Sequence, residues 1–219
     1  MLMLIKEILP VISMSLIVSM SSTVIAAVSG ITIGVLVGLR DFKMKRLIVR
    51  LLETLMSTPP VLMGLLVYLL ISRKGVLGSL ELLFSPTAMI IAQVLLVFPI
   101  ITGLTISSVE KQGREIKKNC EVLGASKTKT VLTIISEMKG QLLTIIATGF
   151  GRAISEVGAV MMVGGNIKDH TRVMTTYIAL ETGKGNFEGA IIIGGILLVI
   201  SLIINTILHK FKGSEINEY

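Results

Sequence analysis

An arginine and a glutamate interrupt an otherwise apolar stretch of this 219-residue sequence, "GFGRAISEVGAVMMVGGNI" at positions 149–167. Arg152 and Glu156 are four residues apart, so on a helix they would share one face. A charge deep in hydrocarbon costs on the order of 3 kcal/mol, so both groups should face protein or a water-filled cavity. The pair can be a structural ion pair between packed helices. Alternatively, it lines a path in which Arg152 attracts an anion and Glu156 keeps that attraction weak enough for release.

The composition predicts that these charges lie within a membrane. Hydrophobic residues make up 52% of the chain and charged residues only 16%, and the mean hydropathy is +0.85. Long uncharged runs favour transmembrane helices over a barrel. We therefore predict an all-α membrane protein, a single transmembrane domain over residues 1–219 with five spans. The predicted spans cover residues 11–39, 54–72, 82–109, 140–167 and 189–208.

The positive charges predict the orientation of these spans. Most of the 21 Lys and Arg residues lie in the loop after the first span, in the loop 110–139 and in the C-terminal tail. The positive-inside rule places these segments in the cytoplasm, with the N-terminus outside and the C-terminus inside. The net charge of +7 then reflects topology and attraction to membrane lipid, and we expect no nucleic-acid partner.

Small and helix-breaking residues predict how the spans pack. Gly30, Gly34 and Gly38 recur at every fourth position, which lets another helix approach closely, within the chain or across a dimer. Pro59–Pro60 predicts a kink or a helix start. "GGN" at 164–166 suits a helix end, and Asn166 is also a candidate gate residue on the transport path.

The loop 110–139 is predicted to be a folded elbow. Apolar residues recur at helical spacing on both sides of Gly124, which indicates two short helices meeting at that glycine. Such an elbow would offer a small apolar knob to a protein partner. The residues of this elbow tip are Cys120, Glu121, Val122, Leu123, Gly124, Ala125 and Ser126.

Two motifs carry a resemblance to a known family. "CEVLGAS", followed by Ile134, resembles the cytoplasmic EAA loop of ABC importer permeases, although Lys118 stands where that pattern has its glutamate. "GRAISEVGA" is similar to a segment of the permeases that import sulfate, molybdate and tungstate. The continuation "MMVGGNIKDHTRVMTTYIALETGKGNF" resembles the tungstate-type branch.

The resemblance implies a type I importer fold in a prokaryotic cytoplasmic (inner) membrane. It also implies a permease homodimer, two cytoplasmic ATPase subunits that dock on the elbow, and an extracytoplasmic oxyanion-binding protein. The implied cargo is an oxyanion, with tungstate as the first expectation and molybdate and sulfate left open.

The sequence itself supports a division of labour between subunits. The chain contains no G-x-x-x-x-G-K-[ST] phosphate loop, so a partner ATPase is expected to bind ATP and magnesium and to perform hydrolysis. We expect no cofactor in this chain and no enzymatic activity of its own. His170 and His209 fall on opposite predicted sides, so no metal site is expected.

One alternative stays open from the sequence. An ATP-independent secondary anion transporter could use Arg152 and Glu156 as a proton relay. The presence or absence of a P-loop ATPase and a secreted binding protein encoded nearby would discriminate between the two.

Overall fold

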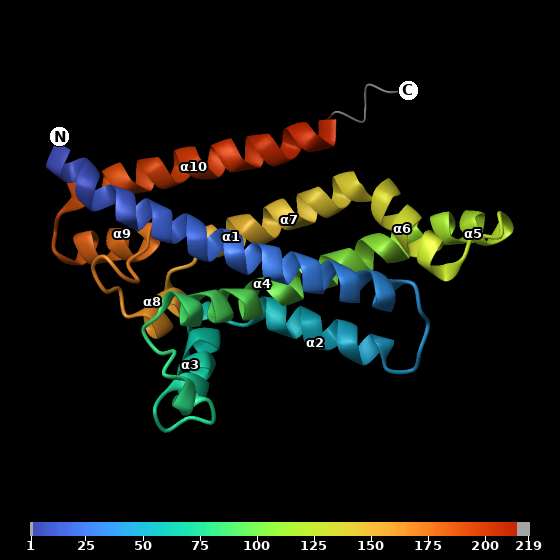
Figure 1. Cartoon of the computed structure of the whole chain (residues 1–219), viewed down its shortest axis with the longest axis horizontal. Helices are drawn as coiled ribbons and strands as arrows, with labels where there is room; N and C mark the ends of the chain where they lie inside the picture. The colour runs from blue at the N-terminus through green and yellow to red at the C-terminus, as the bar shows by residue number, and fades with distance from the viewer. Residues whose placement is uncertain (1, 214–219) are drawn as a thin grey trace.

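The computed structural model describes residues 2–213, and every element assigned in that range is helical (Figure 1). Twelve elements follow one another along the described chain. They are α1 (Leu2–Gly38), α2 (Lys45–Ser57), α3 (Pro60–Ile71), the 3-10 turn η1 (Gly78–Leu80), α4 (Pro86–Ser108), the π-helix η2 (Val109–Gly113), α5 (Arg114–Val122), α6 (Lys127–Glu137), α7 (Lys139–Ile154), α8 (Gly158–Gly164), α9 (Met174–Gly183) and α10 (Phe187–Gly213).

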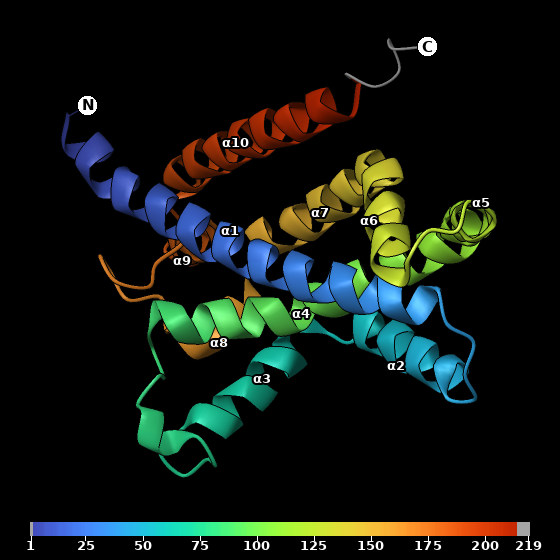
Figure 2. The same cartoon turned by 45° about the vertical axis from the view of Figure 1, so that its right-hand side comes forward.

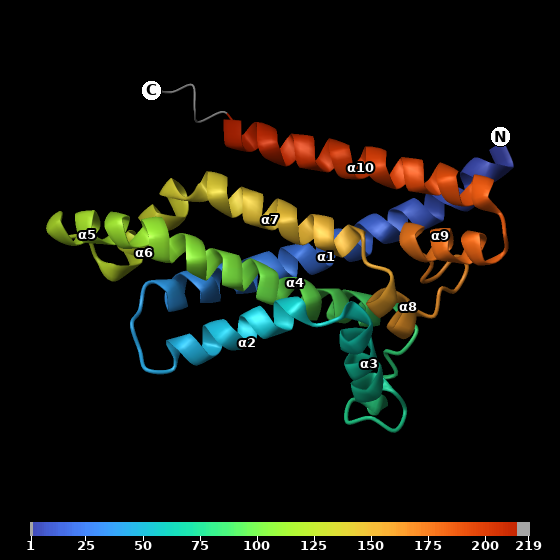
Figure 3. The same cartoon turned by 180° about the vertical axis from the view of Figure 1, so that it is seen from behind.

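The long helices form a bundle with short helices at each end. α1, α4, α7 and α10 run lengthwise, with α5 and α6 at one end and α8 and α9 at the other (Figures 1 and 3). The loop from α1 to α2 lies at the same end as α5 and α6. The predicted cytoplasmic loops therefore cluster at one end of the bundle.

Three helical stretches in the described chain are long and apolar enough to cross a membrane, or up to five if each of two bent pairs counts as one span. The three single stretches are Ile8–Gly38, Pro86–Val122 and Phe187–Leu208. One bent pair is α2 with α3, at 101°, and the other is α6 with α7, at 67°. The first bend directs α3 away from the bundle, as Figure 2 shows.

Two prolines explain the bend between α2 and α3. α2 ends at Ser57, the backbone of Thr58 and Pro59 is extended, and α3 begins at Pro60. Proline lacks the amide that an interior helical position must donate, but it is accepted at the first position of a helix. The expected kink or helix start at Pro59–Pro60 is thereby confirmed.

The glycine stripe of α1 packs against α4 of the same chain. A Cβ atom added at Gly30 would lie 2.9 Å from the Thr102 hydroxyl oxygen, and one added at Gly38 would lie 2.7 Å from Val109 Cγ1. At Gly34 the added Cβ would lie 2.6 Å from Thr105 Cβ. The backbone of α1 therefore approaches the side chains of α4 as closely as only glycine permits.

Gly34→Ala is expected to destabilise the protein by about 1–3 kcal/mol, the usual cost of overpacking a core. The added methyl group would meet Thr105 Cβ at 2.6 Å and the Thr102 carbonyl oxygen at 3.1 Å, and the latter is backbone that cannot rotate away. Thermal unfolding in detergent measures the effect. Gly151→Ala is the matched control, because a Cβ there has nothing within 4 Å; equal unfolding temperatures for the two variants would contradict the prediction.

Candidate functional site

Arg152 and Glu156 do pair in the structure. Arg152 Nη1 lies 3.2 Å from Glu156 Oε2. The Glu156 side chain is only 4% exposed, whereas the Arg152 side chain is 36% exposed. The carboxylate is thus buried, while part of the guanidinium remains open to solvent or to an anion.

The pair does not share one continuous helix, unlike the arrangement that the sequence suggested. α7 ends at Ile154, and Glu156 lies in the break before α8. Glu156 Oε1 accepts a hydrogen bond of 3.1 Å from the backbone N–H of Ala159, in the first turn of α8. A carboxylate stabilises free amides at a helix start, so Glu156 joins the two helix ends as well as neutralising Arg152.

Side chains from three other helices hold this break. Gln93 of α4 donates to the Ala153 carbonyl at 2.9 Å and accepts from the Ser22 hydroxyl of α1 at 2.8 Å. Thr175 of α9 donates to the Glu156 carbonyl at 2.7 Å. The sequence reasoning did not select Gln93, although a glutamine within the apolar span 82–109 was a signal for a buried polar contact.

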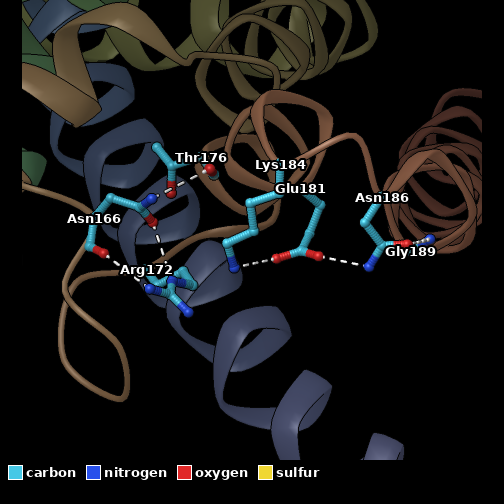
Figure 4. Close-up of polar contacts among 7 residues, drawn as sticks. All are labelled: Asn166, Arg172, Thr176, Glu181, Lys184, Asn186 and Gly189. Carbon is cyan, nitrogen blue, oxygen red and sulfur yellow. Dashed lines mark hydrogen bonds and ion pairs between the residues drawn. The ribbon is translucent and has the colours of Figure 1, made fainter.

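Asn166 lies away from the ion pair. It follows Gly165, which ends α8 at φ 71°, and itself has φ 52°. Its side chain accepts from Arg172 Nε at 3.2 Å and donates to the Thr176 carbonyl at 3.4 Å (Figure 4). The seven-residue helix α8 separates it from Glu156 by about 10 Å of helix rise. The expected helix end at residues 164–166 is confirmed, and Asn166 braces the loop after it.

A second buried carboxylate fixes the turn from α9 to α10. Glu181 accepts from Lys184 Nζ at 2.8 Å and from Asn186 Nδ2 at 2.7 Å, and Asn186 Oδ1 accepts from the N–H of Gly189 in α10 (Figure 4). The hydrogen bond from Lys184, followed by that from Asn186, lowers the pKa of Glu181 from its ordinary 4.5. This turn lies within the stretch "ETGKGNF", which sequence reasoning treated only as a family marker.

The lowered pKa of Glu181 predicts acid sensitivity of this turn. The folded pKa lies below the unfolded value near 4.5, so the stabilisation is complete above that value and is lost as the pH falls through the folded pKa. Amide hydrogen exchange of residues 181–190 at pH 6 and at pH 3 to 4, corrected for intrinsic exchange, should show protection falling in acid. The Glu181→Gln variant should already show low amide protection at pH 6, and it should lose less protection than the wild-type chain when the pH is lowered. If the variant lost as much protection in acid as the wild-type chain, the assignment to Glu181 would be contradicted.

The elbow has the geometry that its sequence predicted. α5 ends at Val122 and α6 begins at Lys127, and Gly124 between them has φ +71°. Val122 is 87% exposed and Leu123 is 84% exposed. Two short helices meeting at Gly124 are therefore confirmed, and they present an apolar tip.

The other residues of the elbow tip divide between inside and outside. Cys120 is buried at 7% exposure, so it packs within the elbow. Glu121 is exposed and lies 3.7 Å from Lys117. The Ser126 hydroxyl accepts from the Lys129 N–H at 3.4 Å and caps α6, while Ala125 is partly buried.

An ionic network attaches the elbow to the bundle. Lys45 Nζ donates to the carbonyls of Gly38 and Arg40 at 3.0 and 3.1 Å, which satisfies the end of α1. It also lies 2.8 Å from Glu110 in η2. Asp41 pairs with Arg114 of α5 at 2.7 Å. These contacts connect the base of the elbow to the end of α1 and the start of α2.

Among the side chains that the structure describes, no group of three His, Cys, Asp or Glu lies close enough together to bind a metal ion. Three features together are typical of a membrane transport protein with several spans. They are apolar helices of membrane-crossing length, a buried ion pair at a helix break, and an exposed apolar elbow.

Comparison with known proteins gives the family. Residues 30–212 match the family of binding-protein-dependent transport system inner membrane components. The chain belongs to this family. This membership favours a binding-protein-dependent transport system over the secondary anion transporter that the sequence left open.

Three relatives match over most of the chain. A tungstate uptake system permease protein of Peptoclostridium acidaminophilum is 47% identical over 206 residues, covering 94% of this chain and 90% of the relative. Another, from Campylobacter jejuni, is 40% identical and covers 78% of this chain and 72% of its own. A probable anion ABC transporter permease protein of Haloferax volcanii is 37% identical over 91% of this chain and 88% of its own.

Proposed function

We propose that this chain is the membrane subunit of an ATP-driven importer that moves tungstate into the cytoplasm. The observation that carries this proposal is the 47% identity to a tungstate uptake permease over nearly the full length of both proteins. Molybdate and sulfate are the competing cargoes, because they share the tetrahedral divalent oxyanion that a cationic side chain attracts.

The elbow is the proposed docking site for an ATPase subunit. Its tip exposes two neighbouring apolar side chains, Val122 and Leu123, that are 87% and 84% exposed. Large apolar side chains that protrude into water favour burial in a partner. The chain has no phosphate loop of its own, so ATP and magnesium would be bound by that partner.

A second copy of the chain is the proposed partner within the membrane. In the single chain only 6% of the most apolar 18-residue stretch of α10 is buried. The exposed residues of α10 include Ile191, Leu198 and Leu202. A two-fold pair would enclose a path that one chain does not, and it would present two elbows to two ATPases. An extracytoplasmic oxyanion-binding protein would then dock at the end formed by α8 and α9.

The ion pair is the proposed charged element of the transport path. Glu156 is fixed by α8 and by Arg152, while the open part of the Arg152 guanidinium can donate to a passing oxyanion. The carboxylate beside it limits how tightly the anion binds, as conduction requires. In this proposal Glu156 holds the helix break and Arg152 contacts the cargo.

The orientation is proposed from the charge distribution, with the elbow in the cytoplasm. A cysteine placed at Thr182, in a variant with Cys120 replaced by serine, should react with a membrane-impermeant thiol reagent added to whole cells. A cysteine at Ser126 should react only after the membrane is opened. Both positions are exposed in the structure, so reactivity reports the side of the membrane; the reverse pattern would overturn the orientation.

Reconstitution tests the transport function directly. Proteoliposomes that contain this chain and its ATPase, supplied with ATP and the binding protein, should accumulate tungstate, and uptake should stop when ATP or the binding protein is withheld. Unlabelled tungstate should compete more strongly than molybdate or sulfate. Uptake that proceeds without ATP and the binding protein would contradict the proposal, and equal competition by sulfate would contradict the assigned cargo.

A further inference from the structure

A cavity lies between the end of α1 and the elbow. It has a volume of about 330 Å³. Its lining includes Leu36 of α1, Leu39 directly after α1, and Thr130 and Val131 of α6. Figure 2 shows the end of α1 beside α6. A second cavity shares Leu36, Leu39, Arg40 and Lys117 with the first, so the two adjoin and form one recess.

The recess is lined by cations from three elements. Arg40 follows α1, Lys117 belongs to α5 and Lys127 begins α6. The lining also holds two carboxylates. Glu121, in the first cavity, forms an ion pair with Lys117 at 3.7 Å. Asp41, in the second cavity, pairs with Arg114 at 2.7 Å. Among the described residues, no carboxylate pairs with Arg40 or Lys127. Arg40 and Lys127 are therefore the lining cations that no described carboxylate neutralises, and the lining keeps a small excess of positive charge.

The position along α1 places this charge at a membrane boundary. The apolar span that includes Leu36 ends at Gly38, and Arg40 follows two residues later. Ile33 and Leu36 are 41% and 42% exposed, so they face lipid in a membrane. An apolar surface therefore leads directly into a cationic recess at the level of the lipid headgroups.

We propose that this recess binds an anionic glycerophospholipid of the leaflet on the elbow's side. Its phosphate would lie among Arg40, Lys117 and Lys127, and an acyl chain would lie along the exposed face that includes Leu36. Free inorganic phosphate meets the same cations but has no chain to place against the apolar surface. A bound headgroup would join the end of α1 to both helices of the elbow. The assignment to the cytoplasmic leaflet rests on the proposed orientation.

Lipid binding to the full-length chain in neutral detergent tests the site. Native mass spectrometry with phosphatidylglycerol should give saturable binding, and phosphatidylcholine should bind much more weakly. Replacing Arg40, Lys117 and Lys127 together by glutamine should weaken phosphatidylglycerol binding by about 100-fold, at about fivefold for each cation.

The matched control replaces Lys43, Arg46 and Arg50 by glutamine. These three residues are also exposed and close to the same end, but they line neither cavity.

The control separates a built site from general attraction. Equal weakening in the two triple variants, or equal binding of the two lipids by the wild-type chain, would overturn the proposal. Competition by millimolar inorganic phosphate that removes the lipid would mean a free-anion site instead. Lys127→Gln alone changes one exposed side chain, so it should fold even if the triple variant does not, and it should still show the fivefold loss. The lipid-binding assay contains neither ATPase nor tungstate. The lipid proposal can therefore fail while the transport assay succeeds, and the transport proposal can fail while lipid binding is observed.

Discussion

Val122→Asp is expected to abolish ATP-driven uptake while the protein still inserts into the membrane. Val122 is 87% exposed at the elbow tip, so the free chain tolerates the change. Docking would instead bury an aspartate in an apolar pocket of the ATPase. Loss of one central apolar contact costs about 2 kcal/mol or more, a factor of about 30 in affinity, and a buried unpaired charge adds to that loss. Co-purification of the ATPase and tungstate uptake measure the two consequences.

Val76→Asp is the matched control. Val76 is also a valine that is 87% exposed, but it lies in the segment between α3 and α4, away from the elbow. The ATPase should co-purify with this variant as it does with the wild-type chain. If Val122→Asp retained normal ATPase binding and uptake, the elbow would not be the docking site.

Arg152→Gln is expected to leave the assembled protein intact and to reduce tungstate uptake by about tenfold to 100-fold, the worth of a hydrogen bond to a charged group. Glutamine can still donate to Glu156, but it no longer offers a positive charge to the anion. Glu156→Ala should instead impair assembly, because it removes the acceptor of the Ala159 N–H and leaves Arg152 unpaired. Size-exclusion chromatography reports assembly, and vesicle uptake reports transport.

The double variant Arg152→Ala/Glu156→Ala distinguishes a structural pair from a path-lining pair. Removing both charges avoids an unpaired buried charge, so a purely structural pair predicts rescue of assembly and of uptake. A path-lining pair predicts that uptake stays low in every assembled variant without Arg152. Full uptake by a well-assembled double variant would eliminate the role assigned to Arg152.

Gln93 illustrates a contact that a single sequence does not reveal. The sequence shows a glutamine in an apolar span, which indicates a buried polar partner. It does not identify the partners, because Ser22 and the Ala153 carbonyl are 71 and 60 residues away along the chain. Only the packing of α1, α4 and α7 brings these groups within hydrogen-bonding distance.

The sequence by itself determined the features that depend on local physical chemistry. Apolar runs predicted membrane helices, Pro59–Pro60 predicted a helix start, and Gly124 predicted the turn of the elbow. Tertiary structure alone decided where α7 breaks, which residues hold that break, and that the glycines of α1 face α4. The physical reason is that helix propensity and hydropathy act within a few residues. The break instead depends on contacts between residues far apart in the sequence. Gln93 of α4 donates to the Ala153 carbonyl and Thr175 of α9 donates to the Glu156 carbonyl, while Glu156 itself accepts from the first turn of α8.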